Sequence, residues 1–249
     1  MTRALRGLAA ALAYYTIIPI GRRATHEAPG PAALEWLPPI GAAVGAVAGW
    51  GGYAAFAWLH VSWGFAVAWA LTIVLTGALH VDGFLDSCDG LFASVPPQRR
   101  LEILKDPHHG SFAIAGMAIA TAFWLSALAA IAPSRYPLVL AFSGALARYV
   151  AVVQARFFPY ARPAGLAASF VRPPNALALV AIGLAIEGLA WWIAPWTLAI
   201  GPVALLGAWL AARWSSRRLG GGLTGDVYGG AIVVAEIGIL LAVCVIVRR

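Results

Sequence analysis

The chain has 249 residues, of which 61% are hydrophobic and 11% are charged, and its mean hydropathy is +0.82. Soluble domains usually carry roughly a quarter charged residues, so this composition excludes an ordinary soluble domain and indicates a membrane protein. The net charge of +7 and the pI of about 10.0 would also suit nucleic-acid binding, but no compact basic domain is present to hold a duplex. We therefore expect the lipid bilayer, and no nucleic acid, as a partner.

The first apolar stretch, residues 1–19, has the general form of a signal peptide, with Arg3 and Arg6 ahead of hydrophobic residues. No cleavage site of small residues follows it. The stretch is also shorter than the roughly 20 apolar residues that a membrane span needs. We interpret it as a retained helix that lies at the interface or re-enters the membrane.

Seven further apolar segments are long enough to cross a bilayer. They are residues 36–59, 63–81, 110–132, 137–156, 176–193, 196–213 and 229–247. There is no internal repeat and no soluble domain. The sequence therefore predicts an all-α fold, a polytopic integral membrane helical bundle of about seven transmembrane helices plus the N-terminal helix, with residues 1–249 as a single membrane-embedded domain.

The basic residues are distributed unequally between the two sides of this predicted bundle. One side has eleven: Arg22, Arg23, Arg99, Arg100, Lys105, Arg156, Arg162, Arg172, Arg213, Arg217 and Arg218. The other side has three: Arg135, Arg248 and Arg249. Because basic residues concentrate in cytoplasmic loops, we expect the eleven to lie in the cytoplasm.

Three aspartates stand at the cytoplasmic edge of the second span, in "HVDGFLDSCDGLFAS" (residues 80–94). If the helix continues, Asp82, Asp86 and Asp89 fall within about 60° of one another on one face. Carboxylates this close repel one another and lose solvation at a membrane edge, which a divalent cation would relieve. Oxygen ligands favour Mg²⁺ or Mn²⁺ over zinc. The alternative is a solvated helix end whose aspartates only cap it.

A second polar segment, "LEILKDPHHGSF", follows. We expect residues 97–106 to form a surface helix that ends before a proline. Lys105 is the only lysine of the chain, and it would either neutralise charge on a phosphate or form a plain ion pair with Asp106. His108 and His109 are either phosphate donors or loop-packing residues.

The third segment is "RRLGGGLTGDVYGG", residues 217–230. Its glycines, among them Gly225, allow backbone amides to approach a phosphate ahead of a helix N-terminus. Asp226 would either add a carboxylate to the metal cluster or cap that helix. Arg148 interrupts the fourth span, and a charge there usually faces the bundle interior and pairs. It would bind a substrate phosphate, as would Arg156, or pair with one of the aspartates.

In this order the segments resemble the cobalamin synthase family, the adenosylcobinamide-GDP ribazoletransferases. The resemblance rests on "GALHVDGFLDSCDGLFAS", "RRLEILKDPHHGSFA", "LARY" and "GGGLTGDVYGG", and it runs through nearly the whole chain. It implies a transferase of late cobalamin biosynthesis that joins adenosylcobinamide-GDP to α-ribazole or its 5′-phosphate. GMP leaves, and Mg²⁺ is required, for which Mn²⁺ would substitute.

The resemblance also implies roles for particular residues. Asp82, Asp86 and Asp89 match the metal-binding motif of the family, Lys105 and Asp106 its Lys/Arg-Asp pair, and Asp226 its Gly-Asp loop. The metal ligands would then be Asp82, Asp86, Asp89 and Asp226, and the catalytic residues Asp82, Asp86, Asp89, Lys105 and Asp106. From the chemistry of the residues themselves, we expect Asp89 as the general base and, as substrate-binding residues, Arg148, Arg156, His108, His109, Gly225 and Asp226. The chain departs from the family pattern at Pro107-His108 and at Cys88.

We expect this catalytic domain in the cytoplasmic (inner) membrane of a prokaryote, as a multi-pass protein whose active site faces the cytoplasm. Other copies of the chain and other cobalamin-assembly enzymes are the expected protein partners. Two alternatives remain. One is a phospholipid synthase of the CDP-alcohol phosphotransferase type, although the AR of that signature is missing after Asp82-Gly83. The other is a cation-coupled transporter, whose acids would lie nearer the midplane.

Overall fold

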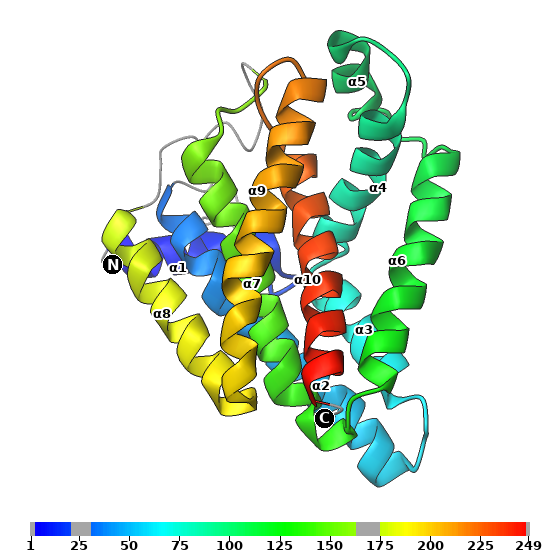
Figure 1. Ribbon diagram of the computed structural model, residues 1–249, viewed down its shortest axis with the longest axis vertical. Helices are drawn as coiled ribbons and strands as arrows, with labels where there is room; N and C mark the ends of the chain where they lie inside the picture. Colours follow the sequence, from blue (N-terminus) through cyan, green and yellow to red (C-terminus); the bar gives the residue numbers. More distant parts are fainter. Residues whose placement is uncertain (1–2, 21–30, 163–174, 248–249) are drawn as a thin grey trace.

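The computed structural model describes residues 3–20, 31–162 and 175–247. Within these ranges the chain is helical and has no strand (Figure 1). The α-helices are α1 Arg3–Tyr15, α2 Pro31–Leu59, α3 Gly64–Leu75, α4 Leu79–Phe92, α5 Pro97–Ile103, α6 Ser111–Ala129, α7 Tyr136–Phe157, α8 Ala176–Ile193, α9 Ile200–Arg218 and α10 Gly225–Val247. Two short 3₁₀ helices, η1 Pro133–Arg135 and η3 Pro195–Ala199, precede α7 and α9.

Six of the described helices, namely α2, α6, α7, α8, α9 and α10, are long and apolar enough to cross a membrane. Helices α3 and α4 together would make a seventh span, but they are bent by 89° at their junction. The predicted polytopic helical bundle is therefore confirmed. The predicted segment 63–81 is not one continuous helix but divides at this bend, and the aspartates lie on a helix that turns away from the preceding one.

The bend has a local cause. Gly77 and Ala78 have φ angles of 58° and 59°, and such left-handed residues cannot continue a right-handed helix. Before the bend, the hydroxyl of Thr76 donates to the carbonyl of Thr72 (2.9 Å), so the last turn of α3 keeps its polar groups satisfied. A hydrophobicity pattern has no marker for this, since apolar residues continue on both sides of the break.

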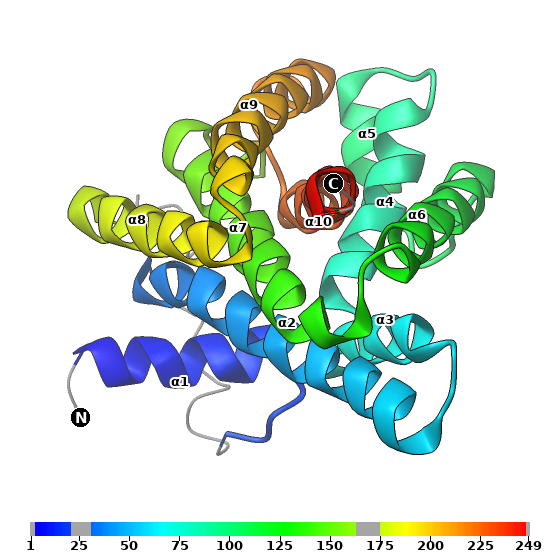
Figure 2. The same cartoon turned by 60° about the horizontal axis from the view of Figure 1, so that its bottom comes forward.

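Helices α2 and α7 pack closely along their lengths, as Figure 2 shows. The reason is a row of glycines one turn apart on α2, Gly41, Gly45 and Gly49. A Cβ at any of them would overlap the backbone of α7. Small residues at such positions let membrane helices approach until their backbones touch. This pair forms the rigid centre against which α10 packs.

Helix α1 runs across the bundle rather than along it, and it packs on α2 (Figure 1). It has 13 residues and is not among the described helices that could span a membrane. This agrees with the expected interfacial or re-entrant helix.

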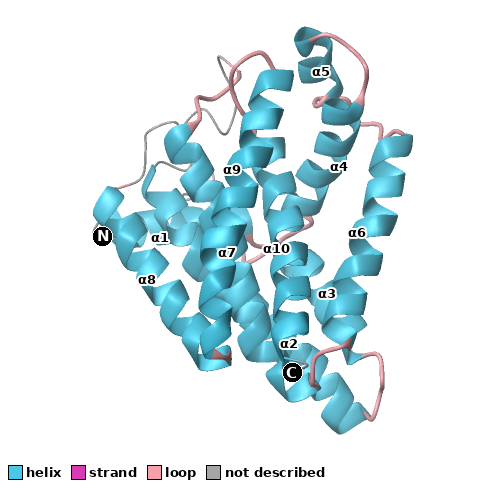
Figure 3. Cartoon of the chain, viewed as in Figure 1, coloured by secondary structure: helices cyan, strands magenta, loops and turns pink. Residues whose placement is uncertain are grey.

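Large apolar side chains cover the outside of α8 and α9. Leu177 and Trp192 of α8 are 79% and 80% exposed, and Val203 of α9 is 69% exposed. Contiguous exposed apolar surface marks an interaction partner in general, and around a polytopic bundle that partner is lipid. Most of the connections lie at the two ends of the bundle (Figure 3), where non-helical backbone can reach water.

The end that carries α5 also carries the carboxyl ends of α7 and α9 (Figure 1). The described basic residues of the larger predicted set lie there: Arg99, Arg100, Lys105, Arg156, Arg162, Arg213, Arg217 and Arg218. Arg135, in η1, lies at the opposite end. Arg22, Arg23, Arg172, Arg248 and Arg249 are outside the described residues. The charge asymmetry of the sequence is thus an asymmetry between the two ends of the molecule.

Candidate active site

The acidic motif of α4 meets the start of α10. At the crossing, a Cβ on Gly83 would lie 2.8 Å from the carbonyl oxygen of Asp226, so a glycine is needed for the two helices to approach. Asp82 and Asp86 are one turn apart on α4. The charges of Asp82 and Asp226 both act on Asp86. The predicted grouping of Asp226 with the acids of α4 is therefore present in the fold.

One arginine joins this acidic group, and the sequence reasoning only counted it among the basic loop residues. Arg162 donates from Nη2 to Asp226 Oδ2 (2.9 Å) and to the carbonyl of Leu104 (3.3 Å). The two side chains are 14% and 24% exposed. Nothing in the sequence around Arg162 distinguishes it from other loop arginines, because its partner lies 64 residues away.

The glycine-rich loop before α10 explains how Arg162 and Asp226 are brought together. Leu223 bonds through its backbone N–H to Pro159 (2.9 Å) and through its carbonyl to Ala161 (2.8 Å). A Cβ on Gly222 would lie 2.8 Å from the backbone of Ala161. The loop is thus fastened to the segment that precedes Arg162.

The other glycines of this loop have conformational reasons. Gly220 and Gly221 have φ angles of 85° and 121°, where L side chains are strained. The hydroxyl of Thr224 accepts from Val227 (3.4 Å) and caps α10. Gly225 begins that helix, so Asp226 is left to face Arg162 instead of capping.

Asp89, the third residue of the predicted stripe, is bound to the start of α6. Its carboxylate accepts the backbone N–H groups of Gly110 (2.6 Å) and Ala113 (3.1 Å). An aspartate in this position caps a helix and interacts favourably with its dipole. Both of its oxygens are therefore engaged in orienting α6, whereas the sequence analysis expected this residue to be the general base.

Two arginines hold the carboxyl end of α4. Arg100 donates to the carbonyls of Gly90 (3.0 Å) and Leu91 (2.7 Å), and Arg218 also donates to Leu91 (2.7 Å). Cations suit the negative end of a helix dipole. The acidic helix is thereby fixed at its far end by groups from α5 and α9.

The loop between α5 and α6 contacts acidic residues of the site through its two histidines. His109 Nδ1 lies 3.8 Å from Asp86 Oδ1. His108 turns to Asp106 instead, with its ring nitrogen 2.8 Å and its backbone N–H 3.0 Å from the same oxygen. Both hydrogen bonds lower the pKa of the Asp106 carboxyl, and the one from the backbone N–H of His108 has the larger effect. Lys105 is exposed beside the Leu104 carbonyl that Arg162 contacts.

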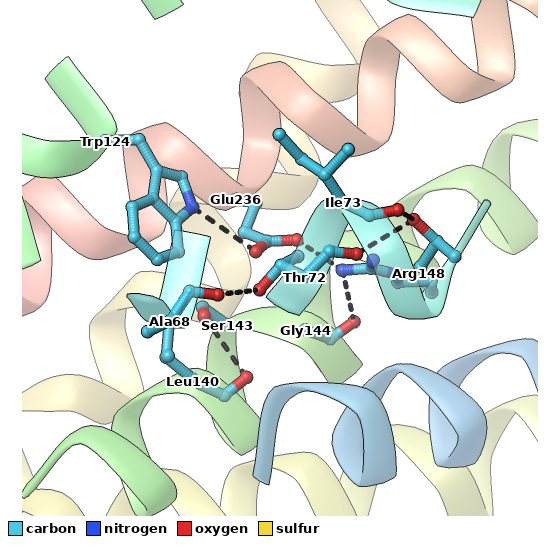
Figure 4. A network of polar contacts seen from close by, with 10 residues as sticks. Ala68, Thr72, Ile73, Trp124, Leu140, Ser143, Gly144, Arg148 and Glu236 are labelled. Atoms are coloured by element: carbon cyan, nitrogen blue, oxygen red, sulfur yellow. Dashed lines mark hydrogen bonds and ion pairs between the residues drawn. The ribbon is translucent and has the colours of Figure 1, made fainter. Parts of the chain in front are cut away.

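Arg148 is not part of this group. It is 3% exposed, lies inside the bundle, and forms an ion pair with Glu236 of α10. Figure 4 shows the pair with its neighbours: the Trp124 indole donates to Glu236 (3.4 Å), and Arg148 also donates to the carbonyl of Gly144 (3.4 Å). Arg148 therefore forms an ion pair, as one of the two alternatives expected, but the partner is Glu236 and not one of the aspartates. Arg156 is exposed near the end of α7.

A cavity of about 260 Å³ opens beside the acids. Asp82, Arg162 and Asp226 line it together with side chains of α1, α2, α4, α7, α10 and the segment after α7. These are Tyr14, Tyr15, Leu34, Leu37, Leu79, His80, Ala151, Ala155, Tyr160, Tyr228 and Ile232. Burial raises the pKa of Tyr160, so its hydroxyl stays protonated and can donate a hydrogen bond.

The donor set at this site fits a hard divalent cation. As the side chains stand, no three carboxylate, histidine or cysteine groups of the described residues are arranged around a metal, since Arg162 holds Asp226 and α6 holds Asp89. Mg²⁺, however, commonly takes only one or two carboxylates and completes its shell with water and substrate phosphate. Asp82 and Asp86, one turn apart with Asp226 opposite, meet that need.

Comparison with known proteins gives a consistent set of relatives. Residues 7–244 match the family model described as cobalamin-5-phosphate synthase. A protein named adenosylcobinamide-GDP ribazoletransferase from Deinococcus radiodurans is 43% identical over 176 residues, which cover 70% of this chain and 62% of that protein.

Two more distant proteins of the same name match over greater lengths. That of Bradyrhizobium diazoefficiens is 32% identical over 93% of this chain and 90% of its own length. That of Chlorobium phaeobacteroides is 32% identical over 96% of this chain and 100% of its own length. No solved structure matches the chain.

Proposed function

Because this chain belongs to the cobalamin-5-phosphate synthase family, we propose that it is an adenosylcobinamide-GDP ribazoletransferase of late cobalamin biosynthesis. In this reaction a ribose hydroxyl of α-ribazole, or of its 5′-phosphate, attacks the phosphorus that carries the cobinamide. A new phosphorus–oxygen bond forms, and the bond to GMP breaks. The hydroxyl proton must pass to a base.

The observation that carries this proposal is the meeting of α4 and α10, where Asp82, Asp86 and Asp226 lie near one another and Arg162 pairs with Asp226. Among the described residues, three carboxylates beside this one guanidinium leave negative charge at the edge of the bundle. A phosphorylated substrate would be repelled by that charge unless a cation accompanied it. The site is therefore suited to a diphosphate that arrives with a divalent ion.

Mg²⁺ would be held by Asp82 and Asp226, which leaves Asp86 free of the metal, and when bound it would neutralise charge on the diphosphate. The guanidinium of Arg162 would keep one N–H on Asp226 and donate another to a phosphate oxygen, since it can contact two anions at once. Lys105, next to the Leu104 carbonyl that Arg162 contacts, would add a second positive charge on the same side.

Proton removal needs a carboxylate that is free to accept. Asp89 is committed to the start of α6 by two backbone N–H groups. We assign the role to Asp86, whose Oδ1 lies 3.8 Å from His109 Nδ1. The ring of His109 is partly exposed, so it would relay the proton from Asp86 to solvent.

The basic end of the bundle would face the cytoplasm of a prokaryotic inner membrane, by the positive-inside rule. The acids belong to this end, next to the α5–α6 loop. Nucleotide substrates made in the cytoplasm would then reach them without crossing the membrane.

A direct assay tests this function. Purified protein in detergent is mixed with adenosylcobinamide-GDP and α-ribazole, with Mg²⁺ or with a chelator, and released GMP is measured. We expect GMP and the joined corrinoid in equal amounts, only with Mg²⁺ or Mn²⁺. No GMP under any condition would contradict the proposal.

The matches to ribazoletransferases do not favour the two alternatives. The same purified protein tests the first alternative, a phospholipid synthase: CDP-diacylglycerol with an alcohol should yield no product. Substrate should likewise not accumulate unchanged in vesicles that contain the protein.

A further inference from the structure

The cavity beside the acids has two kinds of lining. Asp82, Arg162 and Asp226 are charged, whereas most of the remaining wall is aromatic or aliphatic. Among its described lining residues there is no Asn, Gln, Ser or Thr. A largely apolar wall thus lies directly beside Asp82 and Asp226 in the same cavity.

Three of the aromatic residues come from distant parts of the chain. Tyr14 lies in the last turn of α1, Tyr160 follows α7, and Tyr228 lies in the first turn of α10. Tyr14 and Tyr228 both lie near Tyr160 in the cavity wall. The hydroxyl of Tyr160 lies within hydrogen-bonding reach of the Arg162 side chain and the Gly225 N–H. Its ring is therefore held in place at the border between the apolar wall and the charged groups.

This lining discriminates between the ring systems that the two substrates carry. Guanine presents several donors and acceptors along its edge, and burying them against the aromatic and aliphatic part of the wall, away from the charged groups, is costly. A dimethylbenzimidazole ring has a single unsubstituted ring nitrogen and two methyl groups, which suit tyrosine faces and the side chains of Leu34, Leu37 and Ile232. A corrin macrocycle does not fit, because a volume of about 260 Å³ lies below the roughly 300–1,000 Å³ of sites for drug-sized ligands.

We propose that this cavity is the acceptor site, in which the benzimidazole of α-ribazole lies between tyrosines and its ribose points to Asp82 and Asp226. This assignment rests on the proposed function and adds to it the placement of each substrate. The acceptor lies inside the bundle, under α1. The diphosphate of the donor then approaches from the side of the α5–α6 loop, which leaves the corrin ring outside the cavity.

Acceptor binding can be measured without catalysis. Quenching of α-ribazole fluorescence is titrated with the protein in the absence of Mg²⁺ and of adenosylcobinamide-GDP. We expect Tyr14→Leu and Tyr228→Leu to weaken α-ribazole binding about tenfold each, because stacking of a base on an aromatic ring is lost. Tyr228→Phe keeps the ring, so its effect should be about threefold at most. Tyr53→Leu, a tyrosine of α2 that packs on Trp50 away from the cavity, is the matched control.

Steady-state kinetics give an independent readout. The leucine variants should raise the KM for α-ribazole about tenfold and leave that for adenosylcobinamide-GDP within about twofold. Ala155→Phe, which fills the cavity from α7, should abolish α-ribazole binding while donor binding persists. A variant that fails to insert would lose both, so donor binding reports on folding.

Two results would overturn the assignment. One is unchanged α-ribazole binding in Tyr14→Leu, Tyr228→Leu and Ala155→Phe. The other is competition between GMP and α-ribazole for binding, together with a raised KM for adenosylcobinamide-GDP in the leucine variants. That result would mean that guanine binds in the cavity, with its edge hydrogen-bonded to a carboxylate. Failure of the proposed function looks different: the unaltered protein would release no GMP, whatever the binding data show.

Discussion

Helix α10 carries two acidic residues in opposite circumstances. Asp226 and Glu236 are ten residues apart, so about 15 Å separates them along the helix. Glu236 has one buried arginine and an indole N–H as partners, and its charge is balanced. Asp226 shares Arg162 with the Asp82 and Asp86 carboxylates nearby, and that group keeps an excess of negative charge.

The difference separates a structural use of charge from a functional one. A buried ion pair with complete hydrogen bonding fixes how helices meet, although it adds little net stability over apolar residues. A partly exposed cluster with unequal charges is unfavourable by itself and persists where a ligand completes it. Arg148, which sequence reasoning placed with the substrate, belongs by this criterion to the framework.

The largest effect is expected where charge is unbalanced. Asp82→Asn should reduce transfer by at least about 10⁴-fold, equal to roughly 5 kcal/mol of transition-state stabilisation, because a metal-binding oxygen is lost. GMP release measures the rate, and thermal unfolding in detergent should be unchanged. Turnover near that of the unaltered protein would show that the acidic cluster does not bind the metal.

The balanced pair should respond in the opposite way. Arg148→Met leaves the Glu236 carboxylate buried without its partner, which should cost about 3–5 kcal/mol of stability. Arg148→Met combined with Glu236→Leu removes both charges and should recover most of that loss. Thermal unfolding in detergent follows both variants. A double variant as unstable as the single one would mean that the pair does more than balance charge.

Arg162 lies between these extremes. Arg162→Gln keeps a hydrogen-bond donor but removes the charge next to Asp226, which should cost about 1.5–3 kcal/mol. We expect this loss of binding energy to raise the KM for the phosphorylated donor at least tenfold, while the protein stays folded. An unchanged KM together with a lower unfolding temperature would assign Arg162 to the framework as well.

The smallest effect is expected at Asp89. If it only caps α6, Asp89→Ala should lower stability by about 1 kcal/mol, and Asp89→Asn, which keeps one accepting oxygen at the same reach, should recover most of the stability and the activity. An Asp89→Asn variant that is stable but inactive would return the residue to the role of base that the sequence suggested.

Local pattern predicted much of this molecule. Apolar runs long enough to span a bilayer located the six long helices, and the predicted surface helix before Pro107 is present as α5, although it ends at Ile103 and not at residue 106. The spacing of Asp82 and Asp86 placed both on one turn of α4, and the uneven arginines marked one end of the bundle. Each of these depends on residues close together in the chain, where helix geometry alone relates position to direction.

Tertiary structure decided the rest, because it depends on which helix faces meet. The left-handed turn at Gly77-Ala78 redirects the acids, Asp89 is drawn to the start of α6, and Arg148 finds Glu236, 88 residues away. Arg162 reaches Asp226 only because the glycine loop is fastened to residues 159–161. Periodicity shows that a charge needs a partner within a bilayer, but the identity of that partner is fixed by packing between distant segments.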